Sequence, residues 1–183
     1  MVAVLMADGY EDVEALCPYD LLLRAGLAPV LVGVTGKTVR GKACGSVMEC
    51  AITAEELVAS GEKIDMLVLP GGMPGAANID NSPATDKIIE MTEKSGGFFA
   101  AICAAPMVYG KRGMLAGKKA TAFPGFEQYL EGAVISEETV VRDGRFITAA
   151  GMGAALPFGL ELVAALTDKE TAKKLAVAVR AVK

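Results

Sequence analysis

The chain has 183 residues, of which 52% are hydrophobic, so it can bury a core of its own and is too apolar to be disordered. Its net charge of −4 comes without a basic cluster, which argues against nucleic acid as a partner. Because the chain contains no histidine and no Cys-x-x-Cys pair, we expect neither a metal ion nor another cofactor.

The apolar runs and the first residues of the chain predict where in the cell the protein is located. No apolar run reaches the roughly 18 residues that a membrane-spanning helix needs. Met1 leads directly into the apolar residues 2–7, without the basic leader and cleavage site of a signal peptide. We therefore expect a cytoplasmic protein that does not associate with membranes and whose cysteines are reduced thiols.

Short apolar runs alternate with helical patterns along the chain, which is typical of an α/β fold with a mostly parallel sheet. Residues 2–7 predict a strand buried on both faces, and the amphipathic helix that follows extends to about Ala25, where Gly26 ends it. Residues 38–52 predict a hairpin, and the Thr-Ala-Glu-Glu segment 53–56 predicts a capping box that opens a short helix.

The second half of the chain continues the alternation. Residues 64–72 predict a strand that ends in a glycine turn, and Ser82 with Pro83 predicts the start of a helix. Residues 97–103 predict the next strand, and Thr167 begins a second capping box before a final helix. Since no linker, repeat or low-complexity segment interrupts these elements, we predict a single domain over residues 1–183.

The segment "AAICAAPMVYG" predicts a nucleophile elbow at Cys103. Ala101 and Ala105 are the small residues that a sharp strand-to-helix turn requires, and Pro106 suits the first turn of the next helix. The helix N-terminus would favour the thiolate of Cys103, and the N–H of Ala104 could stabilise an oxyanion. The alternative is a small buried cysteine at the end of a strand.

The segment "LPGG" predicts a second group of backbone donors. Gly71 and Gly72 follow a strand end and leave their N–H groups open to a ligand. Taken alone they indicate an ordinary turn. Together with an elbow on a neighbouring strand, they predict the other half of an anion pocket at the carboxyl ends of the strands.

Three acids follow the first strand, namely Glu11, Asp12 and Glu14, and any of them could simply favour the N-terminus of a helix. Pro18 cannot donate a hydrogen bond to the carbonyl of Glu14, which indicates a special position there. A desolvated Glu14 would stay protonated and could donate a hydrogen bond to the Cys103 thiolate. We therefore expect the pKa of the Cys103 thiol to lie well below its ordinary value, without any imidazole.

Four segments of the chain carry a family resemblance. The segments "ADGYEDVEALCPYDLLLRAG", "LVLPGGMPGAANI", "AAICAAPMVYG" and "TAAGMGAALPFGLELVAAL" resemble the DJ-1 family of the ThiJ/PfpI superfamily. The resemblance implies a flavodoxin-like three-layer α/β sandwich and a homodimer. It also implies a reactive cysteine bonded to a protonated glutamate. On the matching positions these are Cys103 and Glu14, with N–H groups donated by Gly72 and Ala104.

The chain departs from this family in two pocket positions. Phe123 stands where members often carry a histidine, and Ala150 stands before Gly151 where members often carry an arginine. With Gly71, these residues predict a pocket that is more apolar and poorer in proton donors. Cys50 resembles a family position at the dimer interface.

The resemblance leaves three functions open. The first is a cofactor-independent glyoxalase or deglycase in which Cys103 attacks a small 2-oxoaldehyde and Glu14 moves protons. The second is a redox sensor or chaperone-like dimer without turnover, in which an oxidant converts Cys103 to a sulfinate. The third, a role in thiazole monophosphate biosynthesis, has no support among the residues. The lack of histidine shifts weight from the first function toward the second.

Overall fold

The computed structural model describes residues 1–182, in which seven strands form one mostly parallel sheet. Their order is β10-β11-β7-β6-β1-β2-β5, and of the neighbouring pairs only β10 and β11 run antiparallel within the described chain. The strands of this sheet are β1 Val2–Met6, β2 Val30–Gly33, β5 Ile52–Thr53, β6 Met66–Leu69, β7 Phe98–Ile102, β10 Val140–Asp143 and β11 Phe146–Ala149. The predicted α/β class is confirmed.

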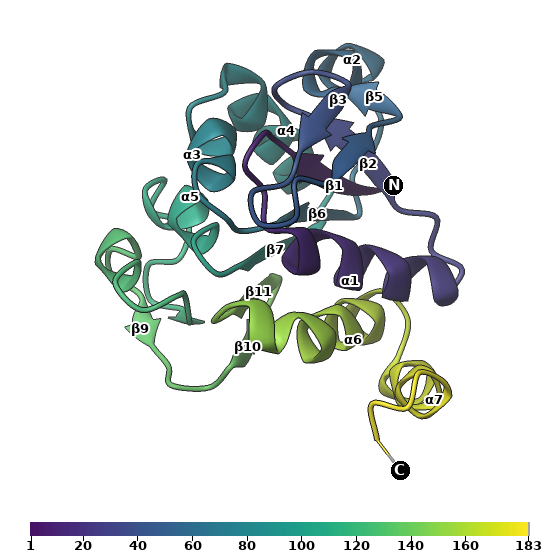
Figure 1. Cartoon of the computed structure of the whole chain (residues 1–183). Helices are drawn as coiled ribbons and strands as arrows, with labels where there is room; N and C mark the ends of the chain where they lie inside the picture. Colours follow the sequence, from purple (N-terminus) through teal and green to yellow (C-terminus); the bar gives the residue numbers. More distant parts are fainter. Residues whose placement is uncertain (183) are drawn as a thin grey trace.

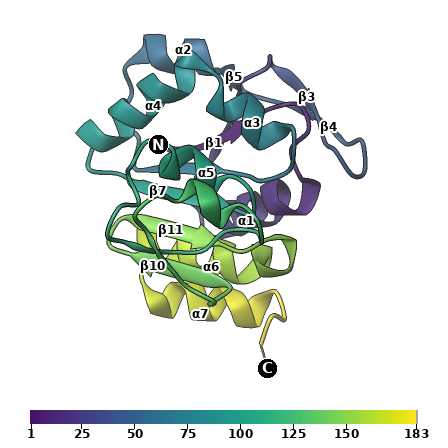
Figure 2. The same ribbon diagram turned by 90° about the vertical axis from the view of Figure 1, so that its left-hand side faces the viewer.

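The central strand β1 explains the three layers. Every residue of β1 is buried, and its side chains alternate between two apolar cores. Ala3 and Leu5 join the core beneath one set of helices, α2 Ala54–Ser60, α3 Gly75–Asp80, α4 Pro83–Lys94 and α5 Pro106–Gly110. Val4 and Met6 join the core beneath α1 Asp12–Arg24 and α6 Ala155–Leu166, on which α7 Lys169–Ala178 packs. Figures 1 and 2 show these two helical layers on opposite sides of the sheet.

Local signals in the sequence are confirmed along the first half of the chain. β3 Thr38–Arg40 and β4 Val47–Glu49 form the predicted antiparallel hairpin. In the predicted capping box, the Thr53 N–H donates to Glu56 Oε2 at 2.8 Å, and the Glu56 N–H donates to Thr53 Oγ1 at 3.1 Å. α1 ends where Gly26 adopts a φ of 76°, as its sequence predicts.

The second predicted capping box is wrong by one residue. α7 is capped by Asp168, whose carboxylate accepts a hydrogen bond from the Thr171 N–H at 2.8 Å. The Thr167 hydroxyl instead donates to the carbonyl of Val163 at 2.7 Å, and so closes the end of α6. Both residues can cap, and Thr167 is taken by the helix that precedes it.

The remaining elements are short. They are β8 Lys119–Ala120, β9 Val134–Ile135 and the 3₁₀ turns η1 Glu127–Tyr129 and η2 Met152–Ala154. Among residues 1–182, no helix has both the length and the apolar character needed to cross a membrane.

The parallel strands bring four distant loops to one edge of the sheet. β1, β6, β7 and β11 are neighbours, so the residues that follow them all emerge at the same carboxyl-terminal edge. These residues include the acids after β1, the glycine pair after β6, Cys103 after β7 and Gly151 after β11. This edge is therefore where the candidate site is built.

Candidate active site

Cys103 has the backbone conformation of a nucleophile elbow. Its φ is 65°, in the left-handed region that non-glycine residues rarely adopt and that costs about 1–3 kcal/mol. Two hydrogen bonds hold it there. The Cys103 N–H donates to the carbonyl of Ala149 at 2.8 Å, and its own carbonyl accepts from the Phe123 N–H at 2.8 Å. The sheet and the loop after β8 thus fix the sulfur at the mouth of the turn.

The helix that follows the elbow begins at Pro106, as the sequence predicts, but it is short. α5 starts at Pro106 and contains only five residues, and its N-cap is Ala105. Cys103 lies before this cap, in a tight turn in which the Ala105 N–H donates to the carbonyl of Ile102 at 3.0 Å. The expected helix dipole at the sulfur is correspondingly weak, because so short a helix aligns few peptide groups. Individual N–H groups of the turn carry the positive potential instead.

Glu14 is the acid that faces this sulfur. Its side chain is only 1% exposed, and its backbone N–H is capped by Glu11 Oε2 at 2.8 Å. Burial is the largest effect on the pKa of Glu14 and raises it to about 7, and the charge of Glu11 raises it further. Hydrogen bonding with the Cys103 thiol and with the Gly71 N–H lowers this pKa in part. Oε2 of Glu14 is buried without a nitrogen or oxygen hydrogen-bond partner among residues 1–182. Such an oxygen is better protonated than charged.

The pKa of the Cys103 thiol does not fall as the sequence predicts. Burial has the largest effect and, with the charge and the hydrogen bond of the Glu14 carboxyl, raises the pKa of this thiol to about 12. The N–H groups of Gly72 and Ala104 lower the pKa in part. The prediction of a low thiol pKa is therefore wrong while Glu14 is ionised, because two negative charges would then lie side by side in a buried site.

Glu14 and Cys103 consequently titrate as a pair. The pair loses its first proton near pH 7 and its second near pH 12. Between these values the two side chains share one proton and one negative charge. Such a pair can supply a nucleophile and a proton donor from the same two residues.

Gly71 and Gly72 are required by the close approach of the chain to this pair. A Cβ on Gly71 would lie 2.6 Å from the Cβ of Cys103 and would overlap Oε2 of Glu14. Gly72 has a φ of 90°, and a Cβ there would lie 2.7 Å from the carbonyl oxygen of Gly9. The Glu11 N–H donates to the carbonyl of Gly71 at 2.9 Å, which joins this turn to the start of α1. The glycine turn and the elbow meet as predicted.

Asp12 has a structural task that its position in the sequence did not reveal. Its carboxylate accepts hydrogen bonds from the N–H groups of Ala43 and Cys44, both at 3.2 Å, and from the Ser46 hydroxyl. Although burial raises the pKa of Asp12, these hydrogen bonds lower it overall. Asp12 thus fixes the tip of the β3–β4 hairpin to α1, and Glu14 alone of the three acids faces the sulfur.

The predicted pocket residues Phe123 and Gly151 come together beside Glu14. If Gly151 carried a Cβ atom, that atom would lie 3.2 Å from a ring carbon of Phe123 and 4.0 Å from Glu14 Oε1. Gly151 has a φ of 159°. Ala150 precedes it in the loop, where its N–H donates to the carbonyl of Thr139 at 2.9 Å. The Phe123 side chain remains 47% exposed, so it forms an open wall of the site.

Two exposed methionines at this edge were not singled out from the sequence. Met73 directly follows Gly72, and Met152 directly follows Gly151. Their side chains are 37% and 55% exposed. Their positions immediately after the two pocket glycines were the signal that could have identified them.

The other cysteines have structural surroundings. Cys50 is buried, and burial raises its pKa to about 11. Burial, with a smaller contribution from the charge of Asp20, also raises the pKa of Cys17. Cys44 is exposed on the hairpin. Asp20 forms an ion pair with Arg24 one turn along α1, at 2.6 Å.

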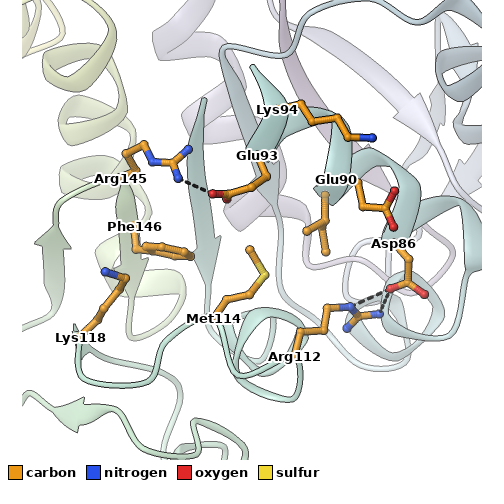
Figure 3. Close-up of a pocket in the computed structure, with 10 residues that line it drawn as sticks. Asp86, Glu90, Glu93, Lys94, Arg112, Met114, Lys118, Arg145 and Phe146 are labelled. Atoms are coloured by element: carbon orange, nitrogen blue, oxygen red, sulfur yellow. Dashed lines mark hydrogen bonds and ion pairs between the residues drawn. The ribbon is translucent and has the colours of Figure 1, made fainter. Parts of the chain in front are cut away.

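A separate groove of about 910 Å³ lies between α4 and the segment 112–118 (Figure 3). It lies beside Phe146 at the start of β11, whereas the Cys103 site lies beyond the end of that strand. Its arginines are already paired, Arg112 with Asp86 at 2.7 Å and Arg145 with Glu93 at 2.7 Å. None of the residues that line it is a cysteine, so the candidate site is the one at the other end of the sheet.

Comparison with known proteins gives a consistent set of relatives. The profile of the DJ-1/PfpI family matches residues 1–165. Protein dj-1beta of Drosophila melanogaster is 33% identical over 177 residues, which cover 94% of this chain and 92% of that protein. The glutathione-independent glyoxalase DJR-1.2 of Caenorhabditis elegans is 28% identical over 167 residues, which cover 90% of this chain and 87% of that protein.

The fold has an equally close counterpart. Oxidized DJ-1 of Toxoplasma gondii superposes with a TM-score of 0.91 at 32% identity, and the match covers 97% of this chain and 96% of that one.

Proposed function

Because the chain belongs to the DJ-1/PfpI family, we propose that it is a stress-response protein whose Cys103 thiolate, held by protonated Glu14, converts small 2-oxoaldehydes such as methylglyoxal without a cofactor. One observation carries the proposal. Glu14 is buried against a cysteine with a left-handed backbone. Because burial raises the pKa of Glu14 to about 7, we infer that the pair keeps one proton above that pH.

Although the pKa values of about 7 for Glu14 and about 12 for Cys103 favour the carboxylate as the charged member of the pair, we place the shared negative charge on sulfur because of the backbone donors around it. On Glu14 it would lie partly on Oε2, which has no nitrogen or oxygen hydrogen-bond partner in the described part of the chain. On Cys103 it would face the N–H groups of Gly72 and Ala104, both of which lower the thiol pKa. A protonated Glu14 would add a third donor to the sulfur.

The proposed reaction follows from this arrangement. The thiolate attacks the aldehyde carbon of methylglyoxal, the N–H groups of Gly72 and Ala104 hold the resulting oxyanion, and Glu14 donates its proton to it. The Glu14 carboxylate then removes the proton from the former aldehyde carbon, which gives an enediolate, and the hydroxyl proton on that carbon passes to the neighbouring oxygen. Glu14 returns its proton to the neighbouring carbon, the carbonyl re-forms on the carbon that carries the sulfur, and a lactoyl thioester results. Water hydrolyses the thioester, which releases lactate and restores the thiolate. Support comes from the glyoxalase name of the Caenorhabditis elegans relative.

We expect the purified protein to convert methylglyoxal to lactate in the absence of glutathione, and a Cys103→Ser variant to form none above the uncatalysed rate. Lactate is measured enzymatically after removal of the protein. A Cys44→Ser variant is the matched control, since Cys44 is exposed on the hairpin, and it should keep full activity. Equal lactate formation by wild type and Cys103→Ser would overturn the enzymatic proposal.

The absence of histidine favours a second candidate, a redox sensor without turnover. In this function an oxidant adds two oxygens to the Cys103 sulfur, and Glu14 with the two N–H groups binds the sulfinate. Mild peroxide should therefore raise the mass of the Cys103 peptide by two oxygens before any other cysteine is oxidised, as mass spectrometry can measure. Earlier oxidation of Cys44 would contradict this.

We further propose that the protein acts as a homodimer. Its surface near α1 and the β3–β4 hairpin exposes the apolar side chains of Val13, Leu23 and Val47, which are 42%, 46% and 52% exposed. In a homodimer, exposed apolar side chains of this kind would be covered by the partner subunit.

A further inference from the structure

Three exposed apolar side chains belong to the loops that form the Cys103 site. They are Met73, Phe123 and Met152, which we call the apolar rim, and they are 37%, 47% and 55% exposed. They come from three separate loops, yet each is tied to the site itself. Met73 follows the glycine whose N–H faces the sulfur, Phe123 donates its N–H to the Cys103 carbonyl, and Met152 follows Gly151.

Within the rim, Phe123 lies nearest to the proton-carrying carboxyl. A Cβ atom on Gly151 would lie 3.2 Å from the Phe123 ring and 4.0 Å from Glu14 Oε1, so the ring and the carboxyl lie on either side of this glycine's open space. Because Gly151 has no side chain, the ring can lie against its backbone and border the space next to Glu14. Because nearly half of Phe123 is exposed, its ring is open to a bound molecule.

We infer that the Cys103 site prefers electrophiles with an aromatic group beside the reacting carbon, and that Phe123 determines this preference. For aldehydes the inference rests on the proposed function and specifies the substrate class as arylglyoxals. A carbonyl carbon bound at the sulfur, with its oxygen toward the N–H groups of Gly72 and Ala104, leaves its substituent to extend toward the rim. An aromatic substituent can pack on the Phe123 ring, whereas a methyl group covers little of it.

The preference can be measured without any turnover. The alkylation rates of Cys103 by iodoacetanilide and by iodoacetamide are compared by peptide mass spectrometry in the folded protein. The exposed Cys44 in the same molecule corrects for the intrinsic reactivity of the two reagents. We expect the ratio of the two rates to be about tenfold higher at Cys103 than at Cys44, which is the gain typical of burying one aromatic ring against another.

Substitutions assign the preference to a residue. Phe123→Ala should reduce the Cys103 ratio to that of Cys44, and Phe123→Leu should keep part of it. Tyr129→Ala is the matched control, because Tyr129 is another partly exposed aromatic residue, 38% exposed, that packs on Phe126 and lies outside the rim. It should leave the ratio unchanged. Equal ratios at Cys103 and Cys44 in the wild type, or failure of both reagents to modify Cys103, would overturn the inference.

Turnover separates this inference from the proposed function. If the protein is a glyoxalase with this preference, kcat/KM for phenylglyoxal should exceed that for methylglyoxal by about tenfold, and Phe123→Ala should remove the difference. An alkylation preference without turnover of either aldehyde would sustain the inference and reject the enzyme. Equal kcat/KM values together with equal alkylation ratios would sustain the enzyme and reject the inference.

Discussion

Replacing Glu14 with leucine is expected to raise the pKa at which the Cys103 thiolate forms by at least about one unit, or roughly 1.4 kcal/mol. The reason is the shared proton. In the wild type the pair gives up its first proton near pH 7. Under the proposed function the remaining proton is on Glu14, which donates a hydrogen bond to the sulfur. Leucine fills similar space but offers no donor, so the buried thiolate keeps only the N–H groups of Gly72 and Ala104.

Two further variants test the geometry of this donor. Glu14→Gln keeps an N–H donor of nearly the same shape and should retain the thiolate best. Glu14→Asp keeps the acid but moves it by about one methylene, so the hydrogen bond is longer or misaligned. The thiolate is followed by its ultraviolet absorbance, as a difference from the same variant carrying Cys103→Ser. Glu90→Leu, a change of an exposed glutamate on α4, is the control and should leave the titration unaltered.

The sign of the shift distinguishes two charge states. If Glu14 were the ionised member of the pair, its removal would eliminate a neighbouring negative charge and lower the thiol pKa from about 12. A fall in Glu14→Leu would therefore reject the protonated donor and leave the backbone N–H groups as the only activators of Cys103.

The free energy of unfolding is expected to fall by about 3 kcal/mol between pH 4.5 and pH 7 because of Glu14 alone. Burial raises the pKa of Glu14 from 4.5 to about 7, so in this window the folded protein holds a proton that the unfolded chain has already lost. Unfolding then releases a proton, and each further pH unit makes this release more favourable. The stabilisation is complete below pH 4.5 and is lost as the pH rises through 7.

Glu14→Gln should abolish this part of the pH dependence, because glutamine cannot ionise. Relative to the wild type, the variant should gain about 3 kcal/mol on going from pH 4.5 to pH 7. Urea unfolding at a fixed protein concentration measures both profiles, with Glu90→Gln as the exposed control on α4. Parallel profiles for wild type and Glu14→Gln would show that this carboxyl ionises as easily in the fold as in the unfolded chain.

The sequence predicts those parts of the fold that depend on near neighbours. Thr53 and Glu56 cap a helix because they lie three residues apart, and the elbow at Cys103 is readable because Ala101 and Ala105 flank it within the same segment. Even a local signal can mislead: Thr167 was expected to cap α7, but its hydroxyl donates to the Val163 carbonyl at the end of α6.

Contacts between distant segments could not be predicted in the same way. The bond between Asp12 and Ser46 spans thirty-four positions, and neither residue type announces it. The titration of Cys103 depends on how deeply Glu14 is buried beside it, which follows from the packing of α1 over the sheet. The sequence therefore predicted the raised pKa of the buried Glu14, but it did not predict that the pKa of Cys103 rises as well.

Because four loops meet at one edge of the sheet, the Cys103 site forms late while the chain is being synthesised and folds. Cys103 receives its partners from loops that follow β1, β6 and β11, which lie far apart along the polypeptide. A chain that is still being synthesised lacks β11 when Cys103 emerges, and so lacks the Ala149 carbonyl that accepts the Cys103 N–H. The left-handed backbone of Cys103 is therefore held by this bond only after the last strands have joined the sheet.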